Sequence, residues 1–134
     1  MKKIISALLC VLLVLCLSAC GGNVSKAKIH TVNSEMYSQE DISAAIDVIK
    51  SDFKRDWKGC TLKEIYYAGD EITIDHGEWA GRYNADEVIV LLSSFYVGHF
   101  GGNGSLNTDS TYYDWNWILV RTSGGKWQHV DHGY

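Results

Sequence analysis

Imidazole and carboxylate side chains gather near the C-terminal end of this chain. His129, Asp131 and His132 lie close together, and Asp75 and His76 form a second such group. These are ligand types that zinc and similar metals accept. On a strand, however, His129 and Asp131 share a face while His132 points to the other, and no His-x-x-x-His pair is present for a helix. The spacing favours a polar chain end, and we expect no metal and no cofactor.

Two side chains have the chemistry for proton transfer. If the strand face that bears Asp114 looks into a cavity, burial raises the pKa of this carboxyl group and suits it to accept or deliver a proton. His129 offers an imidazole for the same work. An aspartate between aromatic residues is more often hydrogen-bonded to a neighbour at the rim of a sheet. We therefore expect no catalytic residue and keep an enzyme as the alternative.

Aromatic side chains are concentrated on two neighbouring strands, at Tyr112, Tyr113, Trp115, Trp117 and Trp127. Cross-strand packing accounts for most of them, since such pairs contribute about 0.2 to 1 kcal/mol each. Around Trp115 they also alternate with polar side chains, as the wall of a binding groove requires. The sequence predicts a ligand-binding surface at Tyr113, Asp114, Trp115 and His129, with Trp117 in the core.

The first twenty residues differ from the rest of the chain. Lys2 and Lys3 precede an apolar run over residues 4–17, which is shorter than the roughly 20 residues of a spanning helix and typical of a secretory signal. The residues Leu17-Ser18-Ala19-Cys20, followed by two glycines, resemble the lipobox of bacterial lipoproteins. The alternative is an ordinary signal peptide with a cysteine at its cleavage site.

The lipobox resemblance implies cleavage before Cys20 and a diacylglycerol thioether, with acyl chains such as palmitate, on its sulfur. A signal peptide over residues 1–19 is then removed, and the chain is anchored in the cell membrane with its domain on the extracytoplasmic face. Two acyl chains make such attachment stable. The partners that we expect are this membrane and an unknown small ligand or envelope protein.

Cleavage also changes the charge and the cysteine content. It removes two of the 12 basic side chains and none of the 16 acidic ones, so the net charge falls from −4 to −6. Nucleic acid is excluded as a partner, because binding phosphate needs clustered Lys and Arg. With Cys10 and Cys16 removed and Cys20 lipidated, Cys60 is a single thiol without a disulfide partner, and we expect it to be buried.

The remaining chain divides into a tether and one domain. Residues 20–37 are small and polar without a regular period, which predicts a flexible, lipid-anchored tether. Ser38 is placed to cap a helix that ends near Gly59, and apolar residues recur in it at helical spacing, at Ile42, Ile46, Ile49 and Phe53.

Strands follow the helix. The sequence predicts them at 61–67, 72–74, 87–97, 112–121 and 127–131, with a connection at 76–84 and a glycine-rich loop at 98–110. The run over 87–97 is continuously apolar, so both of its faces should be covered. This order predicts an α+β fold over residues 38–134, in which an N-terminal amphipathic helix packs on a curved antiparallel sheet.

The order of the helix, the strand from Ala85 to Phe95, Trp117-Ile118-Leu119-Val120-Arg121 and Gly125-Lys126-Trp127 is similar to the cystatin-like cone of the nuclear transport factor two superfamily. The aromatic hairpin from Trp127 to Tyr134 also resembles small lipoproteins of clostridial-type Gram-positive bacteria, which have no agreed activity. The superfamily includes isomerases, dehydratases and binding modules, so the likeness implies a fold and not an activity. We expect a ligand- or protein-binding module at the cell envelope. The alternative is a small isomerase- or dehydratase-like enzyme that uses a carboxylate in the cone.

Overall fold

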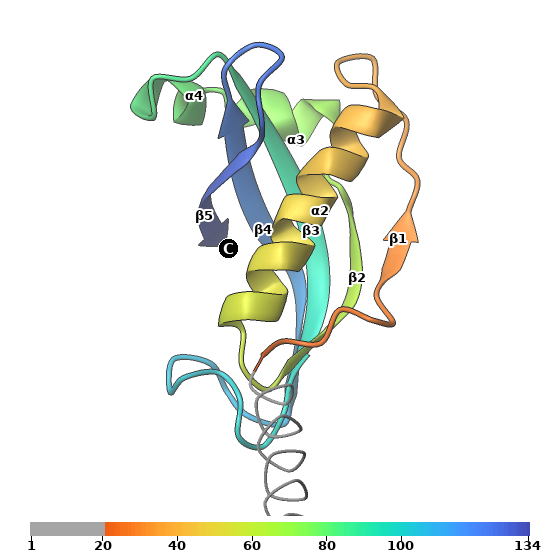
Figure 1. Ribbon diagram of the computed structural model, residues 1–134, viewed down its shortest axis with the longest axis vertical. Coiled ribbons are helices and arrows are strands. Elements are labelled where there is room, and N and C mark those ends of the chain that lie inside the picture. The colour runs from red at the N-terminus through yellow and green to blue at the C-terminus, as the bar shows by residue number, and fades with distance from the viewer. Residues whose placement is uncertain (1–20) are drawn as a thin grey trace, which may run out of the picture.

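The computed structural model describes residues 21–134, so the predicted signal peptide and the predicted lipidation site at Cys20 lie outside the described residues. The described chain is an α+β fold with three helices and a mixed sheet of five strands in the order β1-β2-β3-β4-β5 (Figure 1). The elements are β1 (Lys28–His30), α2 (Gln39–Asp56), β2 (Cys60–Tyr67), α3 (Asp70–Asp75), α4 (Glu78–Arg82), β3 (Glu87–Val97), β4 (Ser110–Arg121) and β5 (Gln128–Gly133). No helix in this part of the chain is long and apolar enough to cross a membrane.

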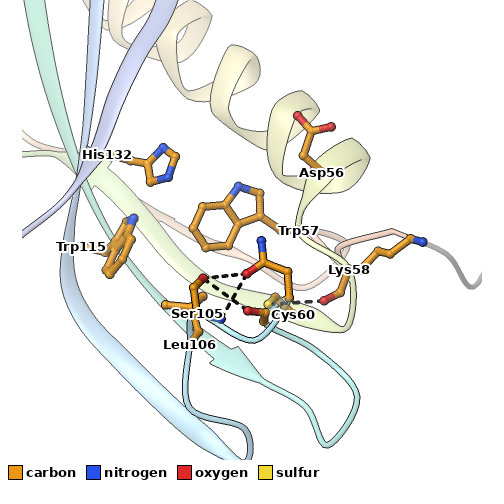
Figure 2. Close-up of a pocket in the computed structure, with 10 residues that line it drawn as sticks. Asp56, Trp57, Lys58, Cys60, Ser105, Leu106, Trp115 and His132 are labelled. Atoms are coloured by element: carbon orange, nitrogen blue, oxygen red, sulfur yellow. Dashed lines mark hydrogen bonds between the residues drawn. The ribbon is translucent and has the colours of Figure 1, made fainter.

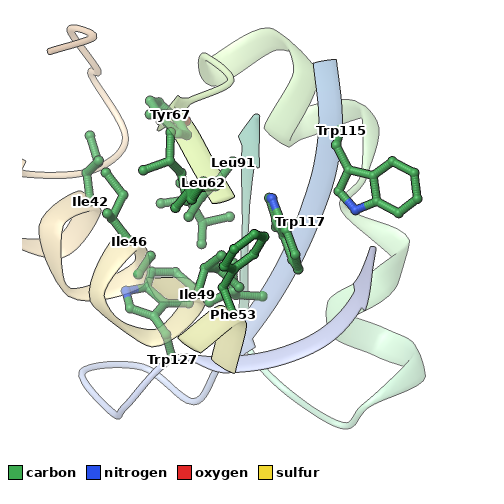
Figure 3. Close-up of a cluster of buried hydrophobic side chains, with 14 of the residues drawn as sticks. Ile42, Ile46, Ile49, Phe53, Leu62, Tyr67, Leu91, Trp115, Trp117 and Trp127 are labelled. Carbon is green, nitrogen blue, oxygen red and sulfur yellow. The ribbon is translucent and has the colours of Figure 1, made fainter. Parts of the chain in front are cut away.

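Helix α2 forms where the capping serine and the apolar spacing predict it. The Ser38 hydroxyl accepts a hydrogen bond from the backbone N–H of Asp41 at 3.1 Å, which satisfies one of the free amides of the first turn. The buried face of the helix packs on the sheet (Figure 3) and consists of Ile42, Ala45, Ile46, Ile49 and Phe53. Burial of each large apolar side chain contributes about 1.5 to 3 kcal/mol, so this face holds the helix in place.

The segment before α2 is part of the domain, which corrects the expected tether over residues 20–37. β1 pairs in parallel with β2, with Lys28 opposite Glu64, and the N–H of Gly22 donates to the carbonyl of Lys54 at 3.0 Å. The sheet is therefore not wholly antiparallel, and a strand, not the helix, comes first. β1 has three residues with exposed side chains, so no apolar period in the sequence marks it.

Tyr37 ties this segment to the core, and its replacement tests that attachment. Its side chain is buried, and its hydroxyl donates to the carbonyl of Val88 at 2.6 Å. Burial raises the pKa of Tyr37 to about 12. We expect Tyr37→Phe to lower the free energy of unfolding by about 1 kcal/mol, the usual contribution of one hydrogen bond.

Urea denaturation measures this change. Tyr113→Phe is the matched control, because Tyr113 is 64% exposed and its hydroxyl makes no hydrogen bond within residues 21–134, so its loss should leave the midpoint unchanged. Equal midpoints for the two variants would show that Tyr37 is not held as described.

Residues 72–74, which the sequence predicts as a strand, lie instead in helix α3. The carboxylate of Asp70 accepts from the N–H of Glu35 at 2.8 Å at the start of this helix. Thr73 is fully buried, and its hydroxyl accepts from the N–H of Val90 at 3.3 Å. These tertiary contacts outweigh the preference of β-branched residues for strands.

β3 is covered on both faces, as its continuous apolar run predicts. Ile89 and Leu91 point toward α2 and belong to the main core. The other face forms a smaller cluster with β4 and α4, made up of Val88, Val90, Ile118, Val120 and Trp79. Helix α4 lies within the stretch that the sequence predicts as a connection.

A bulge in β4 changes which aromatic residues face the core. The register between β3 and β4 shifts between Ser93 and Phe95, and Asp114 in the bulge has a φ of 53°. As a result Tyr112 stacks on Phe95, with ring centroids 5.3 Å apart, while Tyr113 is exposed. Regular alternation along the predicted strand at 112–121 places Tyr113 on the same face as Trp115 and Trp117, and this placement is wrong because a bulge interrupts the alternation of side chains.

Candidate functional site

A pocket opens at the end of the sheet where α2 stops and β2 begins (Figure 2). Its volume is about 470 Å³. Its walls come from the turn between α2 and β2, the loop between β3 and β4, and the strands β4 and β5. The lining residues are Asp56, Trp57, Lys58, Cys60, Gly102, Asn103, Ser105, Leu106, Trp115 and His132.

Trp57 ends α2 and forms the wall beside the helix. Its N–H donates to the carbonyl of Phe53 at 3.0 Å, and its indole stacks on the Phe53 ring with centroids 5.5 Å apart. The chain then turns at Gly59, where φ is +70° and a Cβ would lie 2.7 Å from the Cα of Gly101. Two glycines thus allow the turn to touch the β3–β4 loop, which joins two walls of the pocket.

Trp115 forms a second wall. Its side chain is 9% exposed, and its ring centroid lies 6.0 Å from that of Trp57 and 5.1 Å from that of Tyr134. Within residues 21–134, its Nε1 is the only buried side-chain nitrogen or oxygen without a hydrogen-bond partner. Because an unpaired buried donor costs about 1 to 3 kcal/mol, the protein retains a locally unfavourable group beside the pocket.

His132 reaches the pocket from β5 at the end of a chain of hydrogen bonds. Its Nδ1 lies 3.2 Å from Nε2 of His129, and Nδ1 of His129 lies 3.1 Å from Oδ2 of Asp52 on α2. Burial, and then the charge of His129, lower the pKa of His132 below its usual value. At neutral pH this imidazole is therefore uncharged, with one nitrogen as donor and the other as acceptor.

A second bulge brings the two histidines to one face of the sheet. His129 pairs with Leu119 and His132 with Trp117, and the register shifts between these two pairs. The extra residue in β5 is Val130. Regular alternation would turn His132 away from His129, as the strand pattern of the sequence predicts, but the bulge reverses that outcome.

The structure separates the four residues that the sequence predicts as ligand-binding. Trp115 lines the pocket, although it is nine-tenths buried. His129 does not line the pocket and contacts it through His132. Tyr113 and Asp114 are not among the lining residues, and Asp114 instead accepts a hydrogen bond from the hydroxyl of Tyr66 at 3.5 Å.

Sequence reasoning missed Trp57 and Leu106 as parts of the site. Trp57 lies four residues after Phe53, so it continues the apolar stripe of α2 past the end of the helix. That spacing was the available signal. Leu106 belongs to the glycine-rich loop that the sequence predicts at 98–110, and it packs against the core cluster, a contact that no local pattern reveals.

A second pocket, of about 370 Å³, lies between α3, α4 and the start of β3. The carboxylates at its edge are engaged in structural contacts: Asp86 accepts from the N–H of Ser123 at 2.9 Å, and Glu87 accepts from Nε of Arg121 at 2.6 Å. None of its lining residues carries a buried polar side-chain atom without a partner. The first pocket is therefore the better candidate.

Comparison of the chain with family models, with curated proteins and with solved structures finds no match. Over residues 21–134, no group of three or more His, Cys, Asp and Glu side chains is placed to hold a metal ion. The function must therefore be inferred from the geometry of the pocket and of the hydrogen-bonded residues Asp52, His129 and His132.

Proposed function

We propose that this chain is a lipid-anchored binding module on the extracytoplasmic face of the cell membrane, and that its ligand occupies the pocket between Trp57 and Trp115. The observation that carries the proposal is an aromatic-walled volume of about 470 Å³, within the range of roughly 300 to 1,000 Å³ typical of small-molecule sites. Protein interiors are close-packed, so packing of the core does not account for a pocket of this volume.

The groups around the pocket indicate a flat and neutral ligand. In Figure 2 the carboxylate of Asp56 and the ammonium of Lys58 point away from the space between the two tryptophans. The other side chains that line it are uncharged: indole, imidazole, the Leu106 side chain, the Cys60 thiol, the Asn103 amide and the Ser105 hydroxyl. Burial raises the pKa of Cys60, so the thiol is protonated and uncharged as well.

We also infer that the domain has the cystatin-like cone of the nuclear transport factor two superfamily. Strands β2 to β5 are antiparallel neighbours in chain order, and each of these three pairs contains a register shift, a feature that bends strands. Helix α2 lies across the bent sheet (Figure 1). In this arrangement the pocket lies at one end of the cone, with β1, α3 and α4 as additions.

The position of the described N-terminal residues supports an anchor close to the pocket. Gly21 and Gly22 lie against the last turn of α2, where a Cβ on either residue would collide with the backbone carbonyl of Lys54 or Phe53. The same end of the molecule carries the β3–β4 loop (Figure 1), which includes Phe100, 94% exposed. A lipid on Cys20 would therefore hold the pocket end of the domain next to the membrane.

Binding in the pocket is testable by nuclear magnetic resonance of the purified chain. Flat, neutral probes such as indole and 2-naphthol are titrated into it, and the amide shifts are followed. We expect the largest changes at residues 57–60, 102–106 and 132. Shifts confined to the second pocket, or no saturable shift with any probe, would contradict the proposal.

Cys20→Ala tests the anchor. Because the thioether forms on the cysteine sulfur, we expect a labelled fatty acid to be incorporated into the wild-type chain and not into Cys20→Ala. Cys60→Ala serves as the matched control, since this thiol is buried and should not carry the label. Equal labelling of the wild type and Cys20→Ala would rule out lipidation at this position.

One observation favours the alternative of an isomerase- or dehydratase-like enzyme. Asp52, His129 and His132 connect a carboxylate through two imidazoles to the pocket, an arrangement suited to a general base. Asp114, the carboxylate that the sequence indicates for this role, does not line the pocket. Because the carboxylate of Asp56 points away, no acid faces His132 across the pocket in the described part of the chain, and we favour binding.

A further inference from the structure

We propose that Asp52, His129 and His132 fix Nε2 of His132 as a hydrogen-bond acceptor in the pocket, so that the site selects flat, neutral ligands that carry an N–H or O–H donor. This inference rests on the proposed binding function and adds the chemistry of the ligand. It concerns side chains on α2 and β5 that are distant in sequence and joined by two hydrogen bonds.

Aromatic rings contact both imidazoles, of which that of His129 is the more buried. The ring of His129 lies 5.3 Å from that of Trp117, between centroids, and its side chain is 14% exposed. The ring of His132 lies 5.2 Å from that of Trp57 and 6.1 Å from that of Trp115. The two histidines are therefore held by the same aromatic residues that form the core and the pocket.

The position of each imidazole proton follows from the carboxylate of Asp52, the member of the hydrogen-bonded series that lies farthest from the pocket. An ionised carboxylate only accepts hydrogen bonds, so Nδ1 of His129 carries a proton and donates a hydrogen bond to Asp52. In the neutral imidazole, Nε2 of His129 then has a lone pair and accepts from Nδ1–H of His132. Neutral His132 consequently has its remaining lone pair on Nε2, the nitrogen that makes no hydrogen bond within residues 21–134.

The loop wall of the pocket adds the polar side chains of Asn103 and Ser105, and Nδ2 of Asn103 makes no hydrogen bond within residues 21–134. The hydroxyl of Ser105 donates to Oδ1 of Asn103 at 2.6 Å, and the thiol of Cys60 contacts the carbonyl of Lys58 at 3.7 Å. Figure 2 shows the imidazole of His132 directed toward the space beside Trp57. A ligand that enters this space therefore meets the His132 acceptor and the rings of Trp57 and Trp115, with Asn103 and Ser105 on the loop wall.

The charged groups near the histidine pair determine when this arrangement holds. Asp52 contacts His129 from α2, Asp56 lies one turn further along the helix, and both carboxylates are paired with Arg55. Lys58 follows on the turn, and Asp131 is the charged neighbour on β5. The packing that lowers the pKa of His132 keeps it neutral.

Asp52→Asn tests this series, because it reverses the direction of both hydrogen bonds, the one between Asp52 and His129 and the one between His129 and His132. Oδ1 of Asp52 accepts from Arg55 at 2.8 Å while Oδ2 faces His129. In the variant, the amide oxygen stays on Arg55 and the NH₂ group faces Nδ1 of His129. His129 then donates from Nε2 to Nδ1 of His132, which leaves a proton on Nε2 of His132. Asp47→Asn is the matched control, because it removes one charge from the same helix at an exposed residue that neither lines the pocket nor contacts either histidine.

Two measurements on the purified chain read the result. Imidazole nitrogen shifts should identify the Nδ1–H tautomer for both histidines in the wild type and in Asp47→Asn, and the Nε2–H tautomer in Asp52→Asn. Indole should bind the wild type about tenfold more tightly than benzofuran, which has the same shape without the N–H donor, since tenfold corresponds to one hydrogen bond. In Asp52→Asn this preference should disappear or reverse.

The two readouts separate the inference from the proposed function. If neither probe binds, the proposed function fails, and the tautomers still decide whether the hydrogen-bonded chain exists. If both probes bind wild type equally, the selectivity proposed here is wrong although the pocket is a binding site. An Nε2–H tautomer of His132 in the wild type, or an unchanged tautomer in Asp52→Asn, also overturns the inference.

Discussion

Phe53→Ala is expected to lower the free energy of unfolding by about 3 to 5 kcal/mol, as is usual when a fully buried aromatic side chain is removed from a core. Phe53 is 0% exposed. Its ring lies 5.5 Å from that of Trp57, 6.0 Å from that of Phe95 and 6.3 Å from that of Trp117, between centroids. The cavity left by its removal is bordered by rigid rings that cannot collapse to fill it (Figure 3).

Urea denaturation followed by circular dichroism measures this loss. Lys54→Ala is the matched control, because Lys54 is the next residue of α2, exposed to solvent, and its truncation should change the free energy by less than about 0.5 kcal/mol. A loss below about 1 kcal/mol for Phe53→Ala would mean that α2 does not pack on the sheet through this face.

The parts of the fold that the sequence predicts correctly are those with a local signal. The cap at Ser38 and the apolar spacing locate α2, and the continuous apolar run locates β3 with both faces covered. β1 has no such signal, since its backbone pairs with β2 while its side chains remain exposed. At α3 the local signal is misleading, because Thr73 is held in a helix by its contact with Val90.

The candidate site is less predictable because two bulges decide it. Counting alternate residues along β4 places Tyr113 beside Trp115, and counting along β5 separates His129 from His132. The bulge at Asp114 undoes the first relation, and the extra residue in β5 undoes the second. Bulges depend on how two strands pair, so neither was visible in one strand read alone.

Trp115→Ala is expected to weaken the binding of indole by about thirtyfold or more, which corresponds to about 2 kcal/mol, the usual threshold for a residue that dominates recognition. Trp115 borders the pocket with its ring next to Trp57 and His132. Because it is also nine-tenths buried, the same substitution should lower the melting temperature, so affinity must be measured well below that temperature.

Trp79→Ala is the control that separates the two effects. Trp79 packs in the smaller cluster on the other face of the sheet and stacks with Tyr83, and it does not line the pocket. We expect this variant to lose stability while it retains the affinity of the wild type for indole. Titration calorimetry on both folded variants measures the difference. If Trp115→Ala bound indole as tightly as Trp79→Ala does, Trp115 would be a core residue only, because removing a wall of an occupied pocket must reduce its contacts with the ligand.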